Sequence, residues 1–335
     1  MSAETSAIAG LRARGWAVDP GAVTVALVLL GAAIFLLIGC LRSATFAQYT
    51  VQGIALGSVY GALALALVLV YRATHVINFA QGELAMLTTY IAYELMLKGL
   101  SYWAAFAATL AIAFVLGTLL QVTVIRPVQH SVIAVVIVTV GLFILIDGIV
   151  NWIWGGDFKS MPSPFGIGSF NVGGVVISHL YVGMVIVVLA SVVLVWALFR
   201  FTKLGLGMRA AAMRPAAAAL VGVRVDSMLA IGWGLAAVLG AVAGLMAEPS
   251  QIFLSPTLMQ PILVYAFAAA VLGGLESPAG AVVGGVLIGV TLTLIVGYVP
   301  QISSELQLPF AFAVLLVILL LKPSGLFGRR EVRRV

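Results

Sequence analysis

The chain has 335 residues, of which 63% are hydrophobic and 8% are charged, and its mean hydropathy is +1.21. A typical soluble domain is about one-quarter charged, so this composition excludes a protein with a water-exposed surface over most of its length. The net charge of +6 does not indicate nucleic-acid binding, because the Lys and Arg residues gather in short stretches between apolar segments. Those segments are about 20 residues long and lack strand-like alternation. The sequence therefore predicts an all-α, polytopic membrane helix bundle.

We expect ten membrane spans in a single transmembrane domain that covers residues 1–335. The expected spans are 22–41, 48–71, 78–97, 103–125, 131–154, 180–199, 229–247, 262–275, 279–297 and 306–321. Two of them, 78–97 and 262–275, are short or polar enough to be re-entrant or broken helices, and eight full spans would then remain. The glycine-containing breaks beside Glu83 and Glu276 also suggest two pseudo-repeated halves of five spans each, which is a hypothesis because their sequence similarity is weak.

The positions of the basic residues predict the orientation in the membrane. With both termini on one side, that side holds 14 of the 17 Lys and Arg residues. Cytoplasmic loops retain Lys and Arg, so we expect a cytoplasmic N-terminal tail (1–21), a cytoplasmic segment at 200–228 and a cytoplasmic basic tail (322–335). The Gly-, Ser- and Pro-rich loop 155–179 then lies outside, where it is expected to form a structured cap or a surface that contacts a partner.

Glycines at four-residue spacing predict close packing between helices. Small residues on one stripe of a helix let two backbones approach each other in lipid, where hydrophobicity alone does not drive association. Such spacing occurs at Gly53, Gly57 and Gly61, at Gly240 and Gly244, at Gly280 and Gly284, and at Gly285 and Gly289.

A polar stretch interrupts the apolar sequence at residues 71–87, "YRATHVINFAQGELAML". It contains Asn78, Gln81, Gly82 and Glu83. A carboxylate within hydrocarbon costs a few kcal/mol, so it normally faces a partner or a watery cavity. A glycine break beside it favours a broken helix that lines such a cavity. In the other half, "GGLESPAGA" at 273–281 places Glu276 next to a second glycine-rich break.

Both functional and structural roles are open for these carboxylates. Glu83 either lines or gates a translocation pathway, or it ties helices together through Arg72 or His75. Asp147 lies in an otherwise apolar span and shares a helical face with Thr139 and Asn151, so it either lines a cavity with them or forms a hydrogen-bonded tie between helices. We list Asn78, Gln81, Gly82, Glu83, Thr139, Asp147 and Glu276 as candidate pathway or gate residues.

Residues 200–228 carry five basic residues and a run of alanines. Alanine favours helix, Pro215 suits the first turn of a helix, and Gly222 suits a helix end. We predict one or two short helices on the cytoplasmic face, divided near Pro215. Composition alone leaves two roles open, a helix lying on anionic lipid and a surface that contacts a partner protein.

Several stretches in this order and at this spacing resemble the H-type permease subunit of ABC importers for branched-chain amino acids. They are "GIALGSVYGALALALVLVYRATHVINFAQGELAML", "RPVQHSVIAVVIVTVGLFILI", "TKLGLGMRAAAMRPAAAALVGVRVD", "VLGGLESPAGAVVGGVLIG" and "LLLKPSGLFG". The resemblance runs from about Gly53 to Gly328. It implies that residues 200–228 dock on an ATP-binding subunit, with Arg209, Arg214 and Gly222 in the coupling segment. Met213-Arg214-Pro215 departs from the family pattern of polar or acidic residues after the alanines.

The resemblance also implies the partners and the localisation. It predicts a multi-pass protein of the bacterial inner membrane that works with a second permease subunit, two ATP-binding subunits, a periplasmic or extracellular solute-binding protein and membrane lipid. The implied substrates are branched-chain or related hydrophobic amino acids, or urea and short amides in related systems. An ion-coupled secondary transporter and a channel are the alternatives from other classes.

The chain itself carries no sign of catalysis or of a cofactor. None of its four lysines lies in a G-x-x-x-x-G-K-[ST] phosphate loop, so we expect ATP and Mg²⁺ to bind to separate partner subunits. The single cysteine, Cys40, excludes an internal disulfide and a thiolate metal cluster. His75, His130 and His179 are scattered without the spacing of metal ligands. We therefore predict a membrane transport subunit that is not an enzyme and holds no metal.

Overall fold

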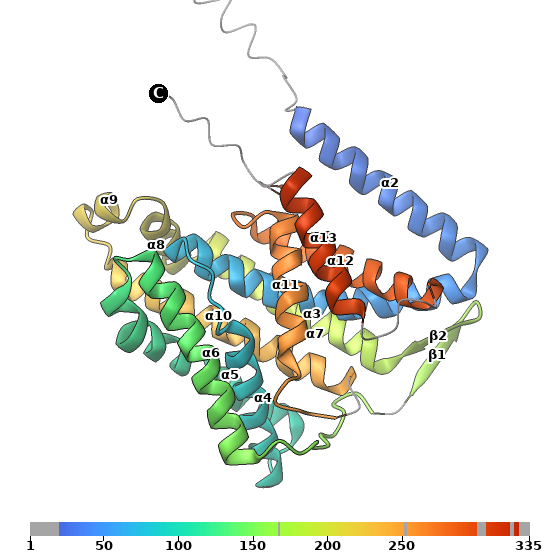
Figure 1. Ribbon diagram of the computed structural model, residues 1–335, viewed down its shortest axis with the longest axis horizontal. Coiled ribbons are helices and arrows are strands. Elements are labelled where there is room, and N and C mark those ends of the chain that lie inside the picture. Colours follow the sequence, from blue (N-terminus) through green and yellow to red (C-terminus); the bar gives the residue numbers. More distant parts are fainter. Residues whose placement is uncertain (1–19, 167, 251–252, 300–305, 322–324, 328–335) are drawn as a thin grey trace, which may run out of the picture.

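The computed structural model describes residues 20–166, 168–250, 253–299, 306–321 and 325–327. Most of both predicted cytoplasmic tails, 1–19 and 328–335, lies outside these residues. The described chain is a helix bundle with one small hairpin (Figure 1). Its α-helices are α2 (Pro20–Arg42), α3 (Ala44–Thr74), α4 (Gln81–Leu97), α5 (Tyr102–Leu120), α6 (Val132–Trp154), α7 (His179–Phe201), α8 (Lys203–Met213), α9 (Pro215–Leu220), α10 (Val225–Ala247), α11 (Met259–Gly273), α12 (Pro278–Tyr298) and α13 (Gln307–Leu321). The short elements are the π-helix η1 (Gln121–Ile125), the 3-10 helices η2 (Arg126–Val128) and η3 (Glu248–Ser250), and the strands β1 (Ser169–Val172) and β2 (Val175–Ser178).

Each of the ten predicted spans coincides with a helix, which confirms the all-α membrane bundle. Within the described residues, six helical segments are long and apolar enough to cross a membrane: Ala44–Thr74, Tyr102–Val128, Val132–Trp154, His179–Phe201, Val225–Ser250 and Pro278–Tyr298. Shorter apolar helices lie at Leu29–Arg42, Met259–Gly273 and Gln307–Val317. These lengths establish a multi-pass protein, while the count of eight to ten spans stays a prediction.

The centre of the bundle is the close crossing of α3 and α12. A Cβ atom built on Gly57 would lie 2.7 Å from the carbonyl oxygen of Gly285, and one on Gly61 would lie 3.0 Å from that of Val282. Because the contacts move backward along α12 as they move forward along α3, the two helices run antiparallel. The glycine spacing therefore predicts this contact correctly.

The chain enters the interior without helical structure between α3 and α4. His75 ends α3 in the left-handed region, with a φ of 55°, and helix resumes only at Gln81. The side-chain amide of Gln81 reaches the carbonyl of Ala236, which lies halfway along the 23 residues of α10. At 1.5 Å per residue, Ala236 is about 17 Å from the start of that helix. Helix α4 thus begins deep inside the bundle, as the polar stretch predicts.

A β-hairpin forms part of the cap that the sequence places outside the membrane. Strands β1 and β2 pair antiparallel, with Phe170 opposite Ile177. The side chain of Gln48, on α3, donates a 2.7 Å hydrogen bond to the carbonyl of Val176 and accepts one of 2.9 Å from its N–H. The loop is therefore structured, although the sequence analysis expected no strand in this chain.

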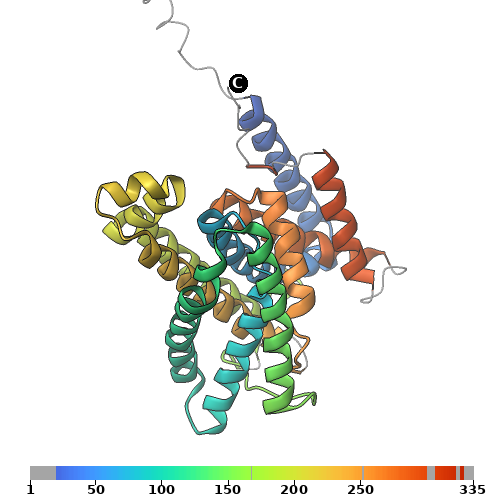
Figure 2. The ribbon, with the colours of Figure 1, turned by 60° about the vertical axis from the view of Figure 1, so that its left-hand side comes forward.

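Helices α8 and α9 lie at the end of the molecule opposite the hairpin and project beyond the long helices (Figures 1 and 2). They are separated at Arg214, and Pro215 occupies the first turn of α9. Gly222, with a φ of 84°, follows α9 and donates a 3.0 Å hydrogen bond to Ala219. The two short helices divided near Pro215 are confirmed.

Candidate functional site

The polar residues before and within the first turn of α4 form one buried hydrogen-bonded group. Asn78 and Gln81 are each 1% exposed. The Asn78 amide donates to the Gln81 side-chain oxygen at 3.1 Å, and the Asn78 oxygen accepts from the N–H of Ala80 at 3.1 Å. Gln81 in turn donates to the Ala236 carbonyl at 2.9 Å. These bonds satisfy backbone and side-chain groups where the chain is not helical, so they fix the position at which α4 begins.

The first turn of α4 also packs against the first turns of α11. A Cβ atom on Gly82 would lie 3.1 Å from the Cβ of Leu263 and 3.4 Å from the carbonyl oxygen of Met259. Gly82 therefore permits close approach of the two helices. The sequence predicts the helix break at this glycine, but Gly82 lies within α4 and the non-helical segment precedes it, at 75–80. Both helices start in the interior at this point, so their N-terminal ends lie together.

Glu83 is buried at this junction without a hydrogen-bond partner among the described residues. It is 1% exposed, and neither of its carboxylate oxygens has a donor with acceptable distance and angle. The Gln260 amide of α11 lies close enough to act on Glu83 as a hydrogen-bond donor, but its geometry falls short of a hydrogen bond, and the Asp147 carboxylate of α6 repels Glu83. A buried charge without a partner is costly, so this position requires an explanation beyond packing.

The two residues proposed from sequence as structural partners of Glu83 lie elsewhere. Arg72 borders a hollow of about 400 Å³ at the end of α3, together with Arg209 of α8 and apolar side chains of α7 and α10. His75 is exposed and caps α3 through its N–H, which donates to Tyr71. Across the part of the chain that the structure describes, the ion pairs are Lys98–Glu94 and Arg126–Asp226. The structure therefore offers no tie from Glu83 to Arg72 or His75 within those residues.

The structure places Asp147 and Thr139 on α6, eight residues apart, and the two differ in burial. Thr139 is fully buried and donates to the carbonyl of Val136 in its own helix. Asp147 is half-buried, and its carboxylate interacts with that of Glu83. The sequence did not predict that Asp147 acts on Glu83, whereas Thr139 has its hydroxyl group satisfied within α6.

Glu276 is not brought together with Glu83. It is exposed on the turn between α11 and α12, and its charge acts on Arg72. The two glycine-rich breaks therefore differ: the one before α4 lies in the interior and the one after α11 at the surface. A pathway role for Glu276 stays a prediction, but it would concern the end of the molecule near α8.

Glu248 and Tyr90 are among the buried polar residues that were not predicted from the sequence. Glu248 follows the end of α10, is 2% exposed and has one carboxylate oxygen without a partner in the described chain. The nearby Tyr102 hydroxyl donates to the carbonyl of Leu245 at 3.0 Å. Tyr90, on α4, is 0% exposed, and its hydroxyl also lacks a partner among the described residues. A glutamate just before Pro249 at the end of an apolar span was the available signal for Glu248.

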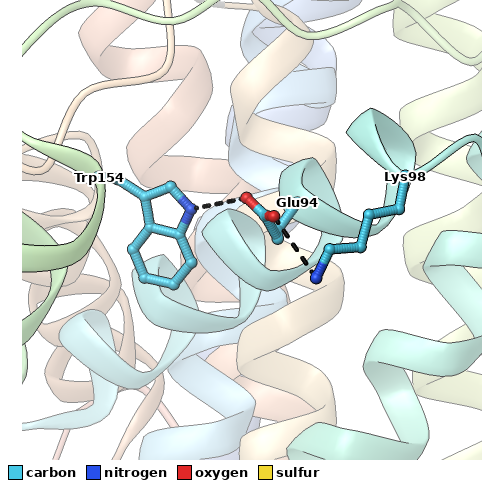
Figure 3. A network of polar contacts seen from close by, with 3 residues as sticks. All are labelled: Glu94, Lys98 and Trp154. Atoms are coloured by element: carbon cyan, nitrogen blue, oxygen red, sulfur yellow. Dashed lines mark hydrogen bonds and ion pairs between the residues drawn. The ribbon is translucent and has the colours of Figure 1, made fainter.

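A small polar network lies beyond Tyr90, at the end of α4 (Figure 3). The indole Nε1 of Trp154, on α6, donates to Glu94 at 3.3 Å. The ammonium of Lys98 lies 3.5 Å from the other oxygen of the same carboxylate. The Lys98 side chain is 66% exposed, so this network reaches the surface of the molecule.

The predicted coupling residues lie on or next to α8 and α9. Arg214 and Gly222 are exposed, and Arg209 is half-buried with its Nε donating to the carbonyl of Gly205 at 3.4 Å. Apolar side chains are exposed beside them, namely Leu204, Leu206, Met213, Leu220 and Val221. The segment thus presents both positive charge and apolar surface. Within the described residues, no group of three or more His, Cys, Asp or Glu side chains could hold a metal ion.

The fold defines a multi-pass helical membrane protein. Residues 49–319 match the family described as "Branched-chain amino acid transport system / permease component", and the chain belongs to that family. It is 30% identical over 304 residues to the high-affinity branched-chain amino acid transport system permease protein LivH of Salmonella typhimurium, covering 87% of this chain and 98% of that protein.

Other relatives match over the same extent. LivH of Escherichia coli K12 is 30% identical over 305 residues, and the permease protein BraD of Pseudomonas aeruginosa is 29% identical over 305 residues. Each of these matches covers 87% of this chain and 98% of the relative. The resemblance seen in the sequence is thereby confirmed, and the chain is a transport subunit of the permease type.

Proposed function

We propose that this chain is a permease subunit of an ATP-driven, binding-protein-dependent importer that carries branched-chain or related hydrophobic amino acids across a bacterial inner membrane. The observation that carries this proposal is similarity over nearly the whole length of relatives that are named as branched-chain amino acid permeases. The substrate is therefore inferred from the family.

The proposed partners are a second permease subunit, two ATP-binding subunits that hold ATP and Mg²⁺, and a solute-binding protein outside. Helices α8 and α9 would contact an ATP-binding subunit. Their exposed Arg214 and Leu220 at one end of the bundle support this role, because a basic and apolar surface suits a protein interface. The excess of basic residues at this end supports cytoplasmic termini.

The proposed pathway passes the junction of α4 with α11 and α6. Glu83 has no hydrogen-bond partner among the described residues, and a second carboxylate, that of Asp147, acts on it. These features support a site that is completed by a passing substrate or by a change of conformation. The hydrogen bonds of Asn78 and Gln81 would hold the start of α4 rigid beside it.

Transport by the reconstituted system tests this function. The complete complex is placed in proteoliposomes, and uptake of radiolabelled leucine is measured with ATP, without ATP, and without the binding protein. We expect uptake only when both ATP and the binding protein are present. Ionophores that dissipate ion gradients should have no effect on this uptake. ATP-independent uptake that ionophores abolish would indicate a secondary transporter, and passive flux would indicate a channel. Uptake of urea or acetamide in place of leucine would indicate that the substrates are urea and short amides.

A further inference from the structure

Polar side chains of α4 form one stripe that faces α6. Glu83, Tyr90 and Glu94 are separated by seven and four residues, which places them on the same face of an α-helix. On α6, Asp147 and Trp154 are also seven residues apart. Asp147 interacts with Glu83, and the ring of Trp154 packs on that of Tyr90 with centroids 5.3 Å apart. We call these five residues the polar seam.

The outer end of the polar seam is closed by paired groups. The indole of Trp154 donates to Glu94, and Lys98 lies beside the same carboxylate (Figure 3). Lys98 and Glu94 are 66% and 39% exposed. This end is therefore accessible to water and its charges are balanced.

The inner end of the polar seam is unpaired. The hydroxyl of Tyr90 and both carboxylate oxygens of Glu83 are buried without a hydrogen-bond partner in the described chain. Asp147 has no ion pair there either, and it repels Glu83. The seam thus contains three carboxylates beside a single described cation, Lys98. Buried acceptors without donors are costly, and a cationic donor would satisfy all of them.

We propose that the polar seam receives the ammonium group of the transported amino acid, which rests on the proposed function. A primary ammonium has three N–H donors and one positive charge. The hydroxyl of Tyr90 accepts a hydrogen bond from it on the way inward, and Glu83 and Asp147 hold it two helical turns deeper. The amide of Gln260, near Glu83, orients the carboxylate of Glu83.

Entry of a ligand into the seam requires that α6 separates from α4. Helix α6 is buried along one stripe only, formed by Val135, Thr139, Leu142, Ile146 and Val150, and it packs mainly on α4 and η1. Separation of α6 from α4 would expose this stripe and break the Trp154–Glu94 hydrogen bond and the contact between the Trp154 and Tyr90 rings.

Protection of Glu83 from chemical labelling tests the proposal without relying on transport. The purified complex is treated with dicyclohexylcarbodiimide, which reacts with carboxyl groups in apolar surroundings, and modification of Glu83 is measured by mass spectrometry. Three probes share one side chain: leucine, isopentylamine, which lacks the carboxylate, and 4-methyl-2-oxopentanoate, which lacks the ammonium. We expect leucine and isopentylamine at ten times their Kd to slow labelling about tenfold, and the oxo acid to have no effect.

Two variants sharpen this measurement. Asp147→Asn should raise the Kd for isopentylamine about tenfold, which corresponds to ~1.4 kcal/mol, while Glu83 remains available for labelling. Asp157→Asn removes one carboxylate from an exposed site on the outer loop and should change nothing. Equal protection by all three probes, or by none, would overturn the proposal. So would equal effects of the two variants.

Thermal unfolding gives a second measurement if Glu83 resists the reagent. Isopentylamine should raise the Tm of the wild-type complex and leave that of Glu83→Gln unchanged, because a ligand stabilises only the form that binds it. An equal rise in both would contradict the ammonium site. If leucine is transported but no amine binds, this inference fails and the proposed function stands. If isopentylamine binds but leucine is not imported, the function fails and the ammonium site stands.

Discussion

The side-chain amide of Gln81 donates a 2.9 Å hydrogen bond to the carbonyl oxygen of Ala236. The two residues are 155 positions apart in the sequence, and their contact joins the start of α4 to the middle of α10. The same side chain accepts from Asn78, so one residue connects the non-helical entry segment to a membrane-length helix. This relationship sets the depth at which Glu83 lies.

Replacement of Gln81 by Ala should destabilise the protein. The amide of Asn78 would lose its acceptor in a buried place, and a stranded buried polar group costs about 1–3 kcal/mol. Thermal unfolding in detergent measures the effect. The control is Thr123→Ala, since that exposed hydroxyl donates only to Leu119 in its own helical segment. Equal Tm values for the two variants would contradict an anchoring role of Gln81.

Gly57→Leu should prevent proper packing of α3 against α12. Its Cβ would lie 2.7 Å from both the Gly285 carbonyl oxygen and the Cα of Val286, and backbone cannot move aside as a flexible side chain can. Overpacking of a core costs about 1–3 kcal/mol or more. Folded, monodisperse yield measures the effect. Gly141→Leu is the matched control, because a Cβ on Gly141 meets nothing within 4 Å in this chain, and its yield should match wild type.

The sequence predicts the helices well because apolar runs of membrane length have few alternatives to the α-helix as a structure. It also predicts the break before α4, since Asn78, Gln81 and Glu83 do not suit the interior of a lipid-facing helix. It does not predict that α4 begins beside Ala236 and Met259, because helix pairing depends on contacts between distant residues. The sequence also does not predict that Glu83 is buried and Glu276 is exposed. Both follow similar glycine-containing stretches, so only contacts with distant residues distinguish them.

The β-hairpin and the buried Glu248 could have been predicted from local sequence patterns. Gly173 and Gly174 both have positive φ and lie between apolar, partly alternating residues, which is the pattern of a two-residue hairpin turn. Glu248 ends an apolar span just before Pro249. Tyr90 differs from both, because a tyrosine in an apolar helix has no distinctive signature. Its unpartnered hydroxyl follows only from the packing of α6 on α4.

Reversal of charge in the coupling segment should impair coupling to the ATP-binding subunits. In the Arg209→Glu, Arg214→Glu double variant, like charges across a contact made by these residues would cost several kcal/mol. We therefore expect the amount of ATP-binding subunit that co-purifies, or the rate of ATP-linked uptake, to fall at least about tenfold. Co-purification and uptake measure these quantities. Arg42→Glu with Lys159→Glu reverses two basic residues away from α8 and α9 and should have no effect. Unchanged assembly and transport in the first variant would favour a helix that lies on lipid.

Glu83→Gln should separate folding from transport. The variant keeps the shape of the side chain and removes a charge that has no partner among the described residues, so the free energy of unfolding should stay the same or rise. Uptake should fall about tenfold, which corresponds to ~1.4 kcal/mol of lost interaction. Folded yield and ATP-driven leucine uptake are measured on the same preparation, with Asp157→Asn as the control for loss of a carboxylate at an exposed site. A collapse of yield would mean that Glu83 ties the fold together, and unchanged uptake would remove it from the pathway.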